Sequence, residues 1–198
     1  MKTLSLLGTT LGFAFTAGLN LYATILVVGL TLRFGWIVLP EPLAGLTALA
    51  HPAVLGVAAA MYLIEFLADK VPAVDHAWDA VHTVVRPLGG AWIAWRTIGG
   101  AGLPEPIDAA VLLIAAGVAL SAHAGKAGTR LATASVGGHA FGIGVALSLL
   151  EDAVAFLLAP LALLKPLLVL GVVIVALAGL AFVIPMGFRT LRRWGRTA

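Results

Sequence analysis

The chain alternates between long apolar stretches and short connections rich in glycine and proline. The first stretch covers residues 4–32, which is longer than the roughly 20 apolar residues needed to cross a bilayer. Small and polar residues interrupt it at positions 16–20, among them Asn20. A broken helix survives inside a bilayer only where protein or a water-filled cavity surrounds the break. The pattern predicts an interrupted first helix or, alternatively, a long tilted helix with a packing notch.

The later apolar stretches divide the chain into two halves. Residues 53–68 predict a second helix, and Arg86-Pro87 opens a third stretch that ends near residue 98. Glycine and proline are concentrated over residues 99–106, so this is the clearest break in the sequence. We expect one membrane domain over residues 1–198, made of a first half, residues 1–98, and a second half, residues 107–198.

The second half repeats the plan of the first. Matching residues occur in the same order in both halves: Thr16 with Ser121, Glu65 with Glu151, and Pro87 with Pro166. This predicts an all-α integral membrane protein with about six transmembrane segments, built as two three-segment repeats. An odd number of crossings per repeat makes the second copy inverted, as in many secondary transporters. The first helix of each repeat is expected to be interrupted, the second over residues 121–130, and in one interpretation both are re-entrant.

Basic residues are distributed unevenly between the two predicted sides of the membrane. With six crossings, one side carries both termini and the basic tail at residues 189–196, and the other carries only Arg33, Arg96 and Lys165. Basic loops usually face the cytoplasm. We therefore predict a bacterial inner-membrane protein with both termini in the cytoplasm.

The composition agrees with a location in the lipid bilayer. Hydrophobic residues make up 61% of the chain and charged residues 11%, against about 25% charged residues in soluble domains. Without cysteine, the chain has no disulfide bonds and no thiolate metal sites. The basic tail adjoins an apolar run and no base-reading motif accompanies it, so nucleic acid is not an expected partner.

Charged residues are concentrated in one stretch, residues 65–90. A helix there would place Asp75, Asp79, His82 and Arg86 on one stripe and apolar residues on another, which is typical of an amphipathic helix at the cytoplasmic interface. Three interpretations stay open: a hydrogen-bond network, direct handling of substrate or protons, or a divalent metal bound by the two aspartates and the histidine. No other cofactor is expected.

Polar residues within other apolar helices suggest a second kind of chemistry. His123, Lys126 and Arg130 share one helical face, which suits an anionic group, although the two basic side chains could instead extend to the cytoplasmic headgroups. Glu65 and Glu151 lie in apolar helices. A charge there costs roughly 2.5–3.5 kcal/mol, so such residues usually face a cavity, pair with a cation or relay protons. A structural ion pair with the lysine or arginine is the alternative.

Two motifs resemble those of a known family. They are Gly18-Leu-Asn20-Leu-Tyr22 and a longer motif that starts at Glu65, continues through Asp69-Lys70, Pro72, Asp75, Trp78-Asp79 and His82-Thr83, and ends at Arg86-Pro87 and Gly89. Together they resemble the domain-of-unknown-function family four-one-two-six, small integral membrane proteins of bacteria and plants. The resemblance covers nearly the whole chain, implies a membrane-protein fold and adds no catalytic residue.

These observations favour a membrane transporter or lipid-translocating protein for a small anion or an anionic lipid headgroup, with proton coupling as an option. The alternatives are a membrane-embedded metal-dependent enzyme and a structural or assembly protein without transport activity. No nucleophile elbow, phosphate loop or zinc-protease signature is present, so an enzyme is less favoured. A homo-oligomer is compatible with the sequence. The residues predicted to line a substrate or proton pathway are Asn20, Glu65, Asp69, Asp75, Asp79, His82, Arg86, Ser121, His123, Lys126, Arg130, Glu151 and Asp152.

Overall fold

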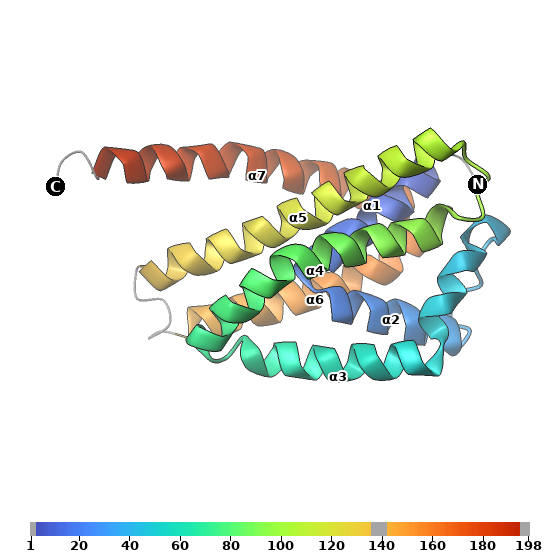
Figure 1. Cartoon of the computed structure of the whole chain (residues 1–198), viewed down its shortest axis with the longest axis horizontal. Helices are drawn as coiled ribbons and strands as arrows, with labels where there is room; N and C mark the ends of the chain where they lie inside the picture. The colour runs from blue at the N-terminus through green and yellow to red at the C-terminus, as the bar shows by residue number, and fades with distance from the viewer. Residues whose placement is uncertain (1–2, 136–141, 195–198) are drawn as a thin grey trace.

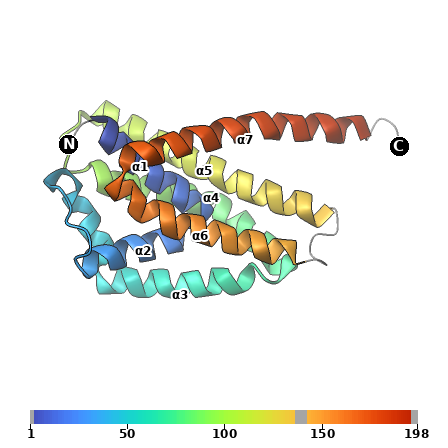
Figure 2. The same cartoon turned by 180° about the vertical axis from the view of Figure 1, so that it is seen from behind.

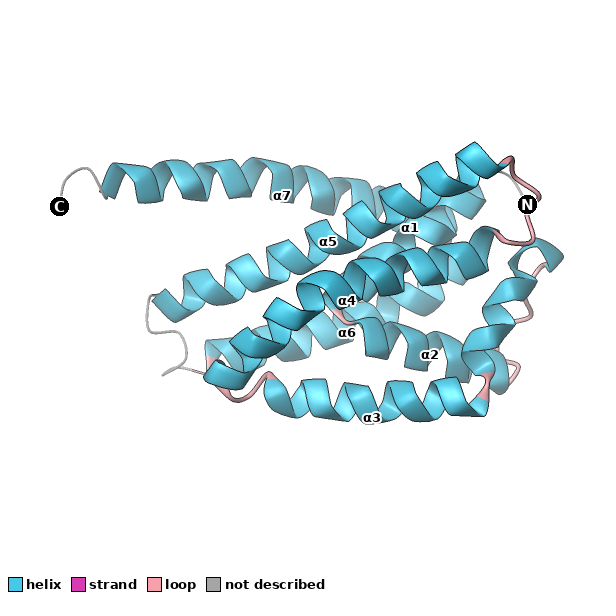
Figure 3. Cartoon of the chain, viewed as in Figure 1, coloured by secondary structure: helices cyan, strands magenta, loops and turns pink. Residues whose placement is uncertain are grey.

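The computed structural model of the chain describes residues 3–135 and 142–194. In this part of the chain every regular element is helical, which confirms the all-α prediction (Figure 1, Figure 3). In chain order the elements are α1 (Thr3–Leu19), α2 (Leu21–Arg33), the 3₁₀ helix η1 (Glu41–Ala50), α3 (Pro52–Ala68), α4 (Pro72–Ile98), α5 (Glu105–Ser135), α6 (Ile143–Leu164) and α7 (Pro166–Trp194). Proline opens α3, α4 and α7, a position where its missing N–H removes no helical hydrogen bond.

The first apolar stretch is broken at Asn20, within the predicted interruption. Asn20 has an extended backbone, with φ −150° and ψ 104°, and separates α1 from α2. Its side-chain carbonyl accepts a hydrogen bond from the backbone N–H of Ala23 at 2.9 Å, which caps the first turn of α2. A residue whose side chain can cap a helix therefore lies at the break between α1 and α2.

After the break, α2 returns to the end of the bundle from which α1 starts (Figure 1, Figure 2). Thr9 of α1 donates a hydrogen bond to the carbonyl of Ala162, near the end of α6, at 2.9 Å. Arg33, at the end of α2, donates to the carbonyl of Ala50, which precedes α3, at 3.4 Å. Because α3 to α7 run alternately along the bundle, both contacts lie at the same end. The α1–α2 hairpin thus enters the bundle, turns at Asn20 and leaves on the same side.

The predicted second interruption is wrong. Residues 121–130 lie within α5, which is one continuous helix. Ser121 and Thr129 donate hydrogen bonds from their hydroxyls to the carbonyls four residues earlier, each at 2.8 Å. These bonds satisfy polar side chains without breaking a helix, so a polar segment rich in small residues is accommodated as regular helix.

Helix length and composition support a membrane protein. Among the described residues, α5 and α6 are long and apolar enough to cross a membrane, and η1 with α3, bent by 62°, makes a third candidate span if the pair counts as one. The six-span arrangement of two inverted repeats is not confirmed. The prediction gave both halves an interrupted first helix. In the structure the first helix of the first half is broken, whereas that of the second half is continuous.

The described chain begins and ends at opposite ends of the bundle (Figure 1). Six crossings would have placed both termini on one side. The turn at Asn20 changes this, because α1 starts at the end that carries Arg33 and Arg96, while α7 runs to the end where α3 meets α4. Lys2, His139 and Arg196 lie outside the described residues.

The most enclosed element is α1. Phe13, Ala14 and Ala17 are fully buried, and α1 contacts α4, α5, α6 and α7. At Gly18 a methyl group would collide with the backbone carbonyl of Ala119 on α5, so the absent side chain lets the two helices approach. The last turn of α1 is thereby held beside the polar residues of α5.

Candidate functional site

A set of charged side chains, buried except for one that is partly exposed, surrounds the C-terminal end of α1. They come from α3, α4, α5, α6 and the link between α3 and α4, and we call them the ionic network. Its members are Glu65, Asp69, Asp75, Arg86, Lys126, Arg130 and Glu151. All of them belong to the predicted pathway set, so the structure brings together residues from both halves of the chain.

Arg86 has no exposed surface. Its Nη2 lies 2.6 Å from Oε1 of Glu65, which is also fully buried. Its Nη1 donates to the carbonyl of Gly18 at 3.0 Å and to Nδ1 of His123 at 2.9 Å. Since Nδ1 accepts this bond, we assign the neutral imidazole to His123, with its Nε2 donating to the carbonyl of Asp79 at 3.0 Å.

Lys126 of α5 joins the two glutamates that occupy matching positions in the two halves. Its Nζ lies 3.4 Å from a carboxylate oxygen of Glu65 and 3.4 Å from one of Glu151. The same ammonium lies 3.8 Å from Asp69 and donates to the carbonyl of Leu19 at 3.2 Å. The alternative in which the lysine extends to the headgroups does not describe this side chain, because its side chain has no exposed surface.

Arg130, one helical turn further along α5, binds three carboxylates. It makes two hydrogen bonds to Asp69, at 2.7 and 3.1 Å, one to Glu151 at 2.7 Å, and a close contact with Asp75. Asp69 lies outside the helices and also accepts a hydrogen bond from Ser148 at 2.8 Å. Burial alone would raise the pKa of Asp69, but its bonds to Arg130 and the charge of Lys126 hold that pKa below its ordinary value.

The network also satisfies the backbone at the break. The carbonyls of Gly18 and Leu19, at the end of α1, accept from Arg86 and Lys126 respectively. Carbonyls at a helix C-terminus carry partial negative charge, and unpaired ones are costly away from water. The two cations therefore explain how a helix can end in the middle of the bundle.

On the α2 side of the break, Asn20 connects to α6. Its Nδ2 donates to Asp152 at 2.8 Å, and Tyr62 of α3 donates to the other oxygen of that carboxylate at 3.3 Å. Sequence reasoning missed Tyr62, because a tyrosine within an apolar helix carries no distinguishing pattern. Ser148 was missed for the same reason.

Asp79, His82 and Ser121 lie outside the ion pairs. The Nε2 of His82 lies 3.1 Å from the hydroxyl of Tyr22, and its Nδ1 lies 2.8 Å from the carbonyl of Trp78. One oxygen of Asp79 is buried without a hydrogen-bond partner in the structure. Ser121 donates its hydrogen bond within its own helix, so the fold does not bring this predicted residue into the ionic network.

The stripe that suggested a metal site is divided between different partners. Asp75 faces Arg130, whereas His82 faces Tyr22. No group of three potential ligands that could hold a metal ion occurs in the part of the chain that the structure describes. The geometry therefore favours the hydrogen-bond and ion-pair interpretation of this stripe.

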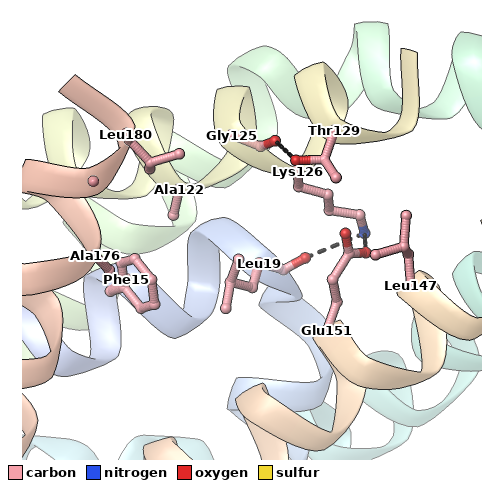
Figure 4. Close-up of a pocket in the computed structure, with 11 residues that line it drawn as sticks. Phe15, Leu19, Ala122, Gly125, Lys126, Thr129, Leu147, Glu151, Ala176 and Leu180 are labelled. Carbon is pink, nitrogen blue, oxygen red and sulfur yellow. Dashed lines mark hydrogen bonds and ion pairs between the residues drawn. The ribbon is translucent and has the colours of Figure 1, made fainter. Parts of the chain in front are cut away.

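A pocket of about 430 Å³ adjoins the network beyond the end of α1 (Figure 4). Phe15 and Leu19 of α1 and Leu180 of α7 form apolar walls, and Lys126 and Glu151 lie at its polar side. The lysine side chain is fully buried, whereas that of the glutamate is 13% exposed. The pocket exists because α1 stops halfway along the bundle while α5, α6 and α7 continue past it (Figure 2).

Comparison with known proteins identifies the family. A family model described as "Domain of unknown function (DUF4126)" matches residues 7–186. The chain therefore belongs to this family, as its two sequence motifs suggested. No curated protein and no solved structure matches the chain.

Proposed function

We propose that the protein is a membrane transporter or lipid-translocating protein, in which the pocket leads a substrate to the ionic network. The observation that carries the proposal is the placement of this pocket at a helix break, beside buried charges contributed by both halves of the chain. Broken helices whose ends meet charged groups inside the bundle are typical of secondary transporters.

The ionic network supplies a route for coupling. Glu65 and Glu151 both lie 3.4 Å from the ammonium of Lys126. Protonation of a network carboxylate, or a substrate that pairs with one, would alter the pairing of the lysine and, through it, its bond to Leu19 at the end of α1. We propose that proton binding in the network is linked in this way to the position of the α1–α2 hairpin.

A structural role without transport is the second candidate. It is favoured by the number of paired charges, since the network joins α3, α4, α5 and α6. A purely structural network does not explain why an open pocket reaches it. The metal-dependent enzyme is not proposed, because the candidate ligands face different partners.

Reconstitution into liposomes tests the proposal. The double variant Glu65→Gln/Arg86→Gln removes the Arg86–Glu65 and Lys126–Glu65 ion pairs, and Lys126 keeps Asp69 and Glu151, so no buried charge is left unpaired. We expect wild-type proteoliposomes to move fluorescent lipid across the bilayer, or to move protons when a solute is added. The double variant should lose this activity while still eluting as a folded, monodisperse protein. Glu105→Gln, at an exposed position at the start of α5, is the matched control. Equal rates in all three proteins, or rates no higher than in empty liposomes, would contradict the proposal.

A further inference from the structure

The polar side of the pocket offers hydrogen-bond acceptors rather than donors. Lys126 is the only basic residue in the described lining, and its ammonium is surrounded by the carbonyl of Leu19 and three carboxylates, those of Glu65, Glu151 and Asp69. An ammonium has three N–H donors, and two of them bond to the carbonyl of Leu19 at 3.2 Å and to Glu65 at 3.4 Å, with Glu151 another 3.4 Å ion-pair partner. An anionic group entering here would compete with these partners for the lysine and would face the carboxylate of Glu151.

The network also contains more carboxylates than cations, which favours a positively charged ligand. Across the ion pairs of the described residues, four carboxylates meet three cations. The partly exposed charged group at the pocket is the carboxylate of Glu151. The C-terminal end of α1 also adjoins the pocket at Leu19, and a helix C-terminus favours cations.

We propose that the pocket binds an amphiphilic amine, with its ammonium beside Glu151 and its hydrocarbon part against Phe15 and Leu180. This rests on the proposed function and replaces the anionic substrate that the spacing of His123, Lys126 and Arg130 suggested. The volume of about 430 Å³ accommodates a small organic cation. A single positive charge suits the site better than a zwitterionic phospholipid headgroup, because the phosphate would face the same acceptor oxygens.

Three ligands with the same tail and different charge test this inference. Hexylammonium, hexanol and hexanoate are titrated against the full-length protein in nanodiscs, with empty nanodiscs subtracted. We expect hexylammonium to bind at least tenfold more tightly than hexanol, and hexanoate to bind more weakly than either. Glu151→Gln should reduce hexylammonium binding to the level of hexanol and leave hexanol binding unchanged, which also shows that the variant is folded.

A second variant fills the pocket without changing a charge. Gly179 lines the pocket, and a Cβ atom added there has no other atom within 4 Å. Gly179→Leu should weaken hexylammonium binding at least tenfold. Gly171→Leu, at another open position on α7, should leave it unchanged. Hexanoate binding as tight as that of hexylammonium, or equal affinities in the two leucine variants, would overturn the inference.

The two proposals can fail separately. Lipid or proton movement that depends on Glu65, without saturable hexylammonium binding, would retain the transporter and remove this ligand class. Hexylammonium binding that depends on Gly179 and Glu151, without any translocation, would retain the binding site and remove transport. Displacement of hexylammonium by short-chain phosphatidylethanolamine would overturn the restriction to singly charged amines.

Discussion

At the scale of single residues, buried charges in this protein are compensated by several partners each. Arg130 binds Asp69, Asp75 and Glu151, and Arg86 binds Glu65 together with a backbone carbonyl. The formation of a buried ion pair contributes little net stability, but removal of one partner leaves an uncompensated charge. The network should therefore be sensitive to single substitutions and tolerant of matched double ones.

Arg130→Gln tests this sensitivity. It leaves Asp69 and Glu151 with Lys126 as their remaining cation and removes the Arg130 contact of Asp75, and we expect a loss of about 3–5 kcal/mol in the free energy of unfolding. Addition of Asp75→Asn should recover part of the loss. Unfolding in detergent measures both, with exposed Arg33→Gln as the control. If the Arg130 and Arg33 variants unfold alike, the ion pairs do not hold these helices together.

The sequence predicted the members of the ionic network and, as one alternative, the pairing of Glu65 and Glu151 with the lysine or arginine, but not the partners of the other members. Apolar surroundings identified Glu65, Glu151 and Lys126, because buried charge is costly wherever it occurs. Helical spacing fixes which residues share a face, but it does not say which helix that face meets. The pairing of Arg130 with Asp69, 61 residues away in the chain, therefore became visible only in the structure.

At the scale of elements, small residues have two different meanings in this chain. Around Asn20 they accompany a real break, because the asparagine caps a new helix and has a partner on α6. In α5, Gly125 instead lies against Leu180 of α7, so glycine there permits helix packing. Sequence pattern alone does not separate a break from a packing site, which is why the interruption predicted in α5 was wrong.

The close approach of α1 and α5 predicts opposite effects for two glycine substitutions. Gly18→Ala places a methyl group against the backbone of α5. It should destabilise the protein and disturb the hydrogen bond from Arg86 to the carbonyl of residue 18. Gly117→Ala, in open space on α5, should be neutral or stabilise by up to about 1 kcal/mol through helix propensity. Thermal unfolding of the two variants compares them directly. Equal or reversed effects would show that the tip of α1 is not held against α5.

At the scale of the whole molecule, the hairpin leaves the two ends of the described chain at opposite ends of the bundle. Hydropathy recognises an apolar stretch, but it does not show whether the chain crosses or turns back, so six crossings were expected. The basic tail at residues 189–196 still favours a cytoplasmic location for the end of α7. We propose that the start of α1 then lies on the opposite side, together with Arg33 and Arg96.

Cysteine labelling tests this topology, because the chain has no cysteine of its own. Leu4 and Phe34 are 61% and 62% exposed and flank the α1–α2 hairpin. Single-cysteine variants at these two positions should react with a membrane-impermeant maleimide from the same, external side of the membrane. A first segment that crosses would place them on opposite sides, and labelling of that kind would refute the hairpin.

The central claim is that substrate passes through the pocket left beyond the end of α1. The most direct measurement compares translocation by Gly179→Leu and Gly171→Leu proteoliposomes at equal protein density. Both variants add the same side chain to α7 at a position with free space, and one of the two lines the pocket. We predict that Gly179→Leu loses at least nine-tenths of the wild-type rate and that Gly171→Leu retains it. Equal rates in the two variants would contradict a pathway through this pocket.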